Sequence, residues 1–180
     1  FFKQKTAYEI MPSLVGSEMC IRDSMDTVHI NWEESVIRFS NIKDSNNSKL
    51  DGKGFYAILG AIYNAEKNNW GNIKLLYIGQ AFGQTLRERI QQEHPAYECV
   101  FDYQKKYPNV GIVVMLGIIE KSTVEKLTQQ LFDDIECCLV FRNQPLCNTS
   151  CKESYSGRDL KVINTGHPYP LKEECPCSKT

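Results

Sequence analysis

The chain has neither a long hydrophobic run nor an excess of basic charge. None of its apolar stretches approaches the ~20 residues that a helix needs to cross a bilayer, so we expect no membrane partner. Lysine and arginine total 21 against 22 aspartates and glutamates, which leaves a net charge of −1. Proteins that bind nucleic acid non-specifically usually carry a basic excess. Any contact of this chain with DNA must therefore be a local patch.

Residues 1–24 lack a regular helical or strand period and are followed at once by Met25. Their stretches KQKTAYEI and LVGSEMCIRD resemble translated sequencing-library adapter oligonucleotides. A signal peptide is the alternative, but Glu9, Pro12 and Glu18 interrupt its hydrophobic region, which makes a poor export signal. We interpret this segment as a disordered, non-native scar and predict a cytoplasmic protein that starts at Met25.

The cysteines allow two interpretations. Without an export signal, the simpler one is a set of reduced thiols in a cytoplasmic protein. The alternative is a zinc site, because Cys147-x3-Cys151 and Cys175-x-Cys177 could supply four ligands. These spacings are not those of a standard zinc ribbon, and the gap between the two pairs is long. We expect packing of the terminal region, or a frayed tail, rather than zinc.

The strand and helix signals between residues 53 and 149 alternate in a simple order. They are strands at 54–63 and 73–79, helices at 84–93 and 96–108, a strand at 109–120, and a helix that a capping box at Ser122 and Glu125 opens and that ends before Pro145. The first two strands read as an antiparallel hairpin with a long polar loop that holds Trp70. The order predicts an α+β fold, a small three-stranded antiparallel sheet flanked by helices.

Two extensions flank this domain. In residues 25–52, the stretch VHINWEESVIRF predicts one strand or a short amphipathic helix. In residues 150–180, the stretch LKVIN reads as extended; we expect an added strand that covers the core, with a substrate-binding extension as the alternative. Within the domain, Lys105 and Lys106 stand beside Tyr103 and Tyr107. That basic and aromatic cluster could contact a nucleic-acid backbone, although a solvated helix end is the simpler interpretation.

The candidate catalytic residues are spread along the domain. Taken singly, they have structural explanations: a strand tyrosine is usually core, and a helix arginine is usually solvated. Glu136 is more informative, because its neighbours at helical spacing are largely apolar and a carboxylate there needs a salt-bridge partner or a metal. The set comprises Tyr56 in Gly54-Phe55-Tyr56, Tyr77 in Tyr77-Ile78-Gly79, Arg87, Glu136 and Asn148.

In this order, the set resembles the GIY-YIG nuclease family, which includes homing endonucleases, some restriction enzymes and an excision-repair nuclease domain. The match covers roughly residues 53–149. The resemblance implies an endonuclease that hydrolyses DNA with Mg²⁺ or Mn²⁺, in repair or restriction, alone or with a DNA-recognition or repair partner. A catalytically silent nucleic-acid-binding module of the same fold is the alternative.

The resemblance also implies a role for each catalytic residue. Glu136 would hold the divalent cation, and Arg87 would bind the scissile phosphate. Tyr56 would act as general base or orient the attacking water, with Tyr77 as its hydrogen-bond partner or that of the phosphate. A tyrosine has an ordinary pKa of about 10, so base action needs a nearby cation to lower it. Asn148 would steady the site through hydrogen bonds.

Four further residues are candidates for binding the substrate. Gly79 lets a backbone or ligand approach closely. Many relatives carry a histidine one turn after the arginine, a position that Gln91 occupies here, whereas His94 lies two turns on and could still face the site. Arg89 could also bind phosphate, although it points about 200° around the helix from Arg87.

Overall fold

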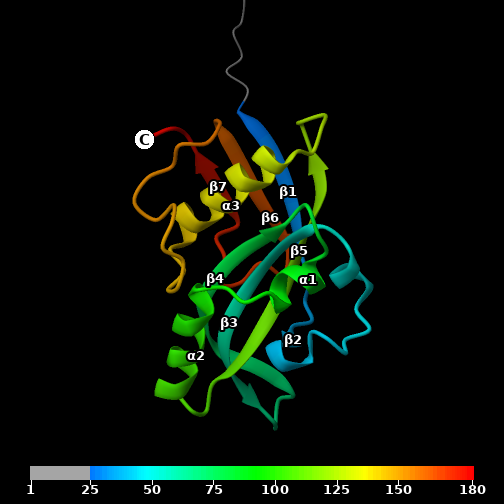
Figure 1. Ribbon diagram of the computed structural model, residues 1–180, viewed down its shortest axis with the longest axis vertical. Helices are drawn as coiled ribbons and strands as arrows, with labels where there is room; N and C mark the ends of the chain where they lie inside the picture. The colour runs from blue at the N-terminus through cyan, green and yellow to red at the C-terminus, as the bar shows by residue number, and fades with distance from the viewer. Residues whose placement is uncertain (1–24) are drawn as a thin grey trace, which may run out of the picture.

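The computed structural model describes residues 25–180, so the interpretation of residues 1–24 as a scar lies outside the described residues (Figure 1). The strands are β1 (Asp26–Trp32), β2 (Ile37–Arg38), β3 (Gly54–Asn64), β4 (Asn69–Ala81), β5 (Gly111–Ser122), β6 (Leu160–Gly166) and β7 (Glu174–Cys177). The α-helices are α1 (Leu86–Gln91), α2 (Ala96–Lys106) and α3 (Gln129–Asn143), with 3-10 turns η1 (Phe39–Asn41) and η2 (Ser48–Asp51). None of these helices is long and apolar enough to cross a membrane.

All seven strands join one mixed sheet in the order β4-β3-β5-β1-β6-β7, with β2 paired to β5. The prediction of a small three-stranded sheet flanked by helices is therefore wrong. The expected antiparallel trio β4-β3-β5 is present, but β1 pairs antiparallel to β5, and β6 then pairs parallel to β1. The trio alone was predicted because its strands are close in the sequence, whereas β1 and β6 are brought together from opposite ends of the described chain. Of the two alternatives for VHINWEESVIRF, the strand is found and the helix is not: the stretch contributes to β1 and also holds the short β2. The extended stretch LKVIN lies in β6.

The β3–β4 hairpin is longer, and its loop shorter, than the sequence predicts. Asn64 pairs with Asn69, so only residues 65–68 form the loop. Trp70 lies in β4 rather than in the loop, with its ring 5.1 Å from that of Tyr63. Because this end of the hairpin is largely exposed, its polar composition hides the strand from a hydrophobic pattern.

The predicted helix start at Ser122 is also wrong. Ser122 ends β5 and pairs with Val28 of β1, so pairing in the sheet overrides the local capping signal. Helix α3 begins after Thr128, whose hydroxyl accepts the Leu131 N–H at 3.2 Å. Leu127 precedes the helix and is 43% exposed.

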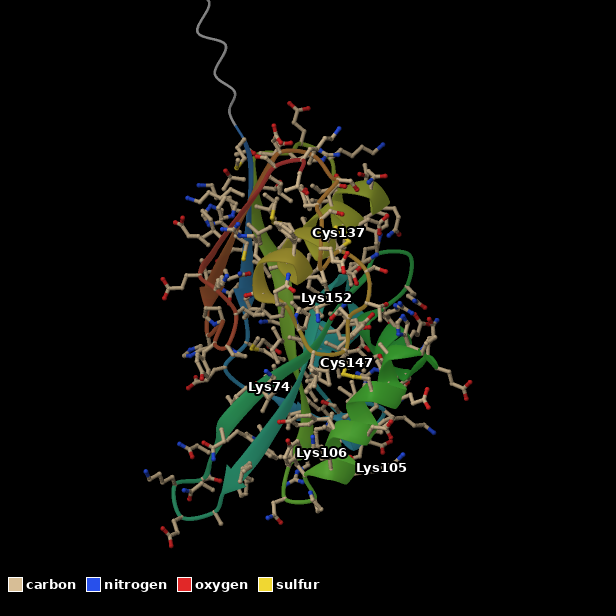
Figure 2. All side chains as sticks on the ribbon, turned by 90° about the vertical axis from the view of Figure 1, so that its left-hand side faces the viewer. Lys74, Lys105, Lys106, Cys137, Cys147 and Lys152 are labelled. Carbon is tan, nitrogen blue, oxygen red and sulfur yellow. A yellow bond between two sulfur atoms is a disulfide. The ribbon has the colours of Figure 1, made fainter. Side chains whose placement is uncertain are left out.

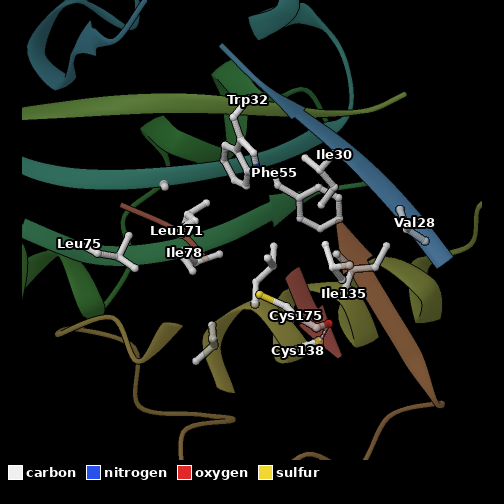
Figure 3. Packing of buried hydrophobic residues seen from close by; sticks show 14 of the residues in the cluster. Val28, Ile30, Trp32, Phe55, Leu75, Ile78, Ile135, Cys138, Leu171 and Cys175 are labelled. Atoms are coloured by element: carbon white, nitrogen blue, oxygen red, sulfur yellow. Dashed lines mark hydrogen bonds between the residues drawn. The ribbon is translucent and has the colours of Figure 1, made fainter. Parts of the chain in front are cut away.

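The sheet separates two cores, and β3 contributes to both because its side chains alternate between faces. Phe55, Ala57 and Leu59 pack on the face that α3 covers, where Figure 3 shows Phe55 among buried aliphatic and aromatic neighbours. Tyr56 and Ile58 pack on the opposite face with residues of α1 and α2. The side chain of Tyr56 therefore belongs to the helical face that carries the candidate arginines.

Three disulfides tie helices α2 and α3 to later segments of the chain. They are Cys99–Cys147, Cys137–Cys151 and Cys138–Cys177. Among the described residues, only Cys175 is a free thiol, and it is buried. The prediction of reduced thiols is wrong, because sequence spacing does not show which cysteines meet in the fold. The cysteines considered as zinc ligands are instead bonded to other partners, Cys175 excepted.

Candidate functional site

The candidate site is built where Tyr56 of β3 meets Gly79 of β4. These two residues are paired across the hairpin, and the Tyr56 ring lies directly over the glycine. A Cβ placed on Gly79 would stand 2.5 Å from both Cζ and Oη of Tyr56, so only glycine leaves room for the ring. Tyr56 is fully buried, and its hydroxyl has no hydrogen-bond partner among the described residues. The ring is held by packing while its polar atom stays free.

Two further tyrosines and a histidine surround Tyr56. The Tyr77 ring lies 6.0 Å from that of Tyr56, 6.1 Å from that of Tyr97 and 5.4 Å from that of His94. Burial raises the pKa of Tyr56 far above its usual range, and burial with the charge of Glu136 raises the pKa of Tyr77 to about 12. Both phenols therefore keep their protons at neutral pH and act as donors. Tyr97, which the sequence did not single out, belongs to the same cluster.

His94 adds another donor to this cluster. Its Nδ1 accepts the Ala96 N–H at 3.2 Å, so the proton of the neutral ring sits on Nε2. Burial, together with the charge of Arg89, lowers the pKa of His94. The ring is therefore neutral at pH 7. Gln91, in contrast, is exposed at the end of α1, outside this group.

Helix α1 presents its two arginines to different parts of the protein. The Arg87 guanidinium bonds Asp51 Oδ1 at 2.8 Å and the backbone oxygens of Ile42, Lys43 and Ser45 at 2.7 to 3.1 Å. Its side chain thus holds the segment before β3 and is turned away from the tyrosines. The guanidinium that was predicted to bind phosphate is therefore engaged in contacts within the protein.

Arg89 is the arginine whose charge acts on the cluster. Its positive charge acts to lower the pKa of five groups, although burial leaves the pKa of the tyrosines and of Glu136 raised overall. These groups are Tyr56, Tyr77, His94, Tyr97 and Glu136. The helix start fixes this orientation, because Thr85 and Glu88 form a capping box that begins α1. Leu86 and Ile90 are buried, and at 100° per residue the two arginines flank that buried stripe on opposite sides. The sequence alone does not tell which flank meets the site.

Glu136 of α3 brings a carboxylate to the site. Burial raises its pKa to about 7, with the Arg89 charge lowering it and the Asp133 charge raising it. Asp133 itself is engaged, because its Oδ1 accepts from Gln80 at 3.0 Å and Gln129 at 2.7 Å. Glu136 has no ion pair or hydrogen bond among the described residues. Its partly buried carboxylate is therefore free for an external cation.

The side chain of Asn148 binds the backbone of β4 at its outer edge. Its Oδ1 accepts the Ile78 N–H and its Nδ2 donates to the Ile78 carbonyl, both at 2.9 Å. Beside it, the Cys147 N–H donates to the Leu76 carbonyl at 2.7 Å, and the disulfide to Cys99 ties this segment to α2. The segment continues the edge of the sheet and holds the strand that carries Tyr77 and Gly79.

The donor set limits which metal the site can take. No group of three or more His, Cys, Asp or Glu side chains arranged for a metal occurs within residues 25–180. One free carboxylate suits Mg²⁺ or Mn²⁺, because hard cations of this kind keep several waters and use one or two carboxylates with substrate phosphate oxygens. Glu136 fits that requirement. Comparisons with protein-family models, with characterised proteins and with solved structures give no match.

Proposed function

We propose that this chain is a metal-dependent endonuclease that hydrolyses phosphodiester bonds in DNA. The observation that carries the proposal is the positive charge of Arg89, which acts on the buried tyrosines and on Glu136, a carboxylate with no hydrogen bond or ion pair among the described residues. Such a site favours an anion that can also share a cation with Glu136. A phosphodiester has both properties.

Each residue takes a role that its environment allows. Arg89 binds the scissile phosphate and offsets the charge that grows on it during hydrolysis. Tyr77 and the Nε2–H of His94 donate to phosphate oxygens and orient them. Tyr56 is fully buried, so it supports the Tyr77 ring by packing, and its raised pKa argues against action as a general base.

Glu136 would hold the cation, which supplies positive charge and a more acidic bound water. This requires the ionised carboxylate, whereas burial favours the neutral one. Asn148 and Gly79 position the strand and make no contact with the substrate in this proposal. A DNA-recognition or repair partner remains part of the proposal, because the chain has a net charge of only −1.

The test is cleavage of labelled duplex, nicked, flapped and single-stranded DNA by protein that starts at Met25. Cutting should require Mg²⁺ or Mn²⁺, stop with a chelator, and be lost in Glu136→Gln and Arg89→Ala. Glu125→Gln is the matched control, because Glu125 is exposed before α3. DNA binding by a folded protein that cuts none of these substrates would favour the silent binding module instead.

A further inference from the structure

A second surface continues from the candidate site along the outer edge of β4. Residues 145–148 run beside this edge, where the Leu146 N–H donates to the Leu75 carbonyl at 3.3 Å, and Ile78 is held next to the site. At the far end of this contact stands Lys74, which is exposed. The segment therefore forms a physical link between the site and Lys74.

Lysines from three elements gather around this segment. Figure 2 shows Lys74, Lys106 and Lys152 in one view of the molecule, together with Cys147. A hollow of about 470 Å³ lies between β4, α2 and the segment; it is lined by Lys74, Cys99, Asp102, Tyr103, Lys106, Tyr107 and Leu146. Lys152 is placed next to the hollow because its Nζ donates to the Pro145 carbonyl at 2.9 Å.

The local charge of this surface is positive although the chain as a whole is not. The one acidic residue in the hollow, Asp102, is bonded to Lys105 at 2.8 Å. Lys74 and Lys106 make no ion pair among the described residues, and the Lys106 ammonium lies 5.5 Å from the centre of the Tyr107 ring. Two apolar groups are also exposed there, Tyr107 at 43% and Leu146 at 45%. Free ammonium groups with an exposed aromatic ring are the combination that binds a nucleic-acid backbone and stacks on bases.

We propose that Lys74, Lys106 and Lys152 bind the phosphate backbone of a nucleic acid that runs along β4 into the candidate site. This inference rests on the proposed function, which supplies the substrate class. Ile78 lies four positions after Lys74, and at ~3.3 Å per strand residue the two are about 13 Å apart. Phosphates of one duplex strand advance about 3.4 Å each along the axis. Lys74 therefore stands about four nucleotides along a strand from Ile78, which lies beside the site.

The test is the salt dependence of binding to a labelled DNA duplex, measured by fluorescence anisotropy in chelator so that nothing is cut. Each lysine that contacts a phosphate contributes about 0.9 to the slope of log K against log salt concentration. We expect Lys74→Ala and Lys106→Ala each to lower the slope by about that amount. Lys126→Ala, an exposed lysine between β5 and α3, should keep the wild-type slope.

The outcomes separate this inference from the proposed function. Unchanged slopes in Lys74→Ala and Lys106→Ala would overturn the inference, even if the protein cuts DNA with Mg²⁺. Slopes that fall as expected in a protein that cuts nothing would support the inference and count against the nuclease. A polyglutamate peptide that binds with the same lysine dependence and displaces the duplex would assign the surface to an acidic protein partner. Absence of any DNA binding by the wild-type protein would also refute the inference.

Discussion

Gly79→Ala is the substitution that most directly tests how the candidate site is packed. The added Cβ would lie 2.5 Å from Cζ and Oη of Tyr56 and 2.8 Å from Cε1, far inside van der Waals contact. The Tyr56 ring is fully buried between Tyr77 and its other neighbours, so it cannot swing into solvent. Either the ring or the strand must move.

The expected loss of stability follows from two opposing effects. Overpacking of a well-packed core costs about 1–3 kcal/mol, and the smaller freedom of alanine in the unfolded chain returns about 0.4–1 kcal/mol. We expect a net loss of about 1–2 kcal/mol. At about 2–4 °C per kcal/mol for a domain of this size, Tm should fall by about 2–8 °C.

Urea unfolding in a double-mutant cycle with Tyr56→Leu identifies the cause. Leucine lacks all three clashing ring atoms, so Gly79→Ala should cost little in that background, and the two substitutions should be coupled by about 1–2 kcal/mol. Gly83→Ala serves as the control, because nothing lies within 4 Å of a Cβ there. An equal cost of Gly79→Ala with and without the Tyr56 ring would show that the clash does not exist.

Three other predictions concern the arginines, the carboxylate and a disulfide. Arg87→Ala should lower the free energy of unfolding by about 1–2 kcal/mol through its lost hydrogen bonds and leave cleavage unchanged. Arg89→Ala should abolish cleavage and leave the free energy of unfolding unchanged. The reverse pattern would contradict the assignment of Arg89 as the phosphate ligand. In metal-free protein, Glu136 should titrate near pH 7 by carbon-13 NMR. Because its folded pKa is raised from 4.5, its stabilising contribution is complete below that value and is lost as the pH rises through about 7, a loss that Glu136→Gln should remove from unfolding curves. Replacing both Cys99 and Cys147 by alanine opens a link across 48 residues and should cost up to about 4 kcal/mol by chain entropy; an unchanged urea midpoint would show that the bond does not form.

The parts of the fold that follow from the sequence are those with a local hydrophobic period. The strands at β3 and β5 and the helices α1 and α2 lie where their patterns predict, because burial on a regular face leaves a regular trace. The first part of β4 leaves none, since Asn69 and Asn72 are polar and exposed. The edge strand β7 also leaves no hydrophobic pattern in the sequence, because Cys175 and Cys177 are buried by contacts with residues far away along the chain.

The sequence indicated which residues form the candidate site, but not which arginine side chain of α1 faces it. The spacing of Tyr56, Gly79 and Asn148 along the chain indicated one site, and the structure brings these residues to the same end of β4. The choice between Arg87 and Arg89 depends on how α1 rolls against the sheet. That rotation is set by distant packing, which no short motif encodes.

The parallel pairing of β1 with β6 has a consequence for how the protein is synthesised. β1 is among the first described segments to leave the ribosome, and its partner Leu160–Gly166 is among the last. At synthesis rates of about 5–20 residues per second, the wait is on the order of ten seconds. Throughout it, β1 offers an unpaired strand edge with buried-type side chains at Val28, Ile30 and Trp32. Until β6 emerges to cover that edge, the nascent chain is exposed to pairing with other chains, and faster translation would shorten this interval.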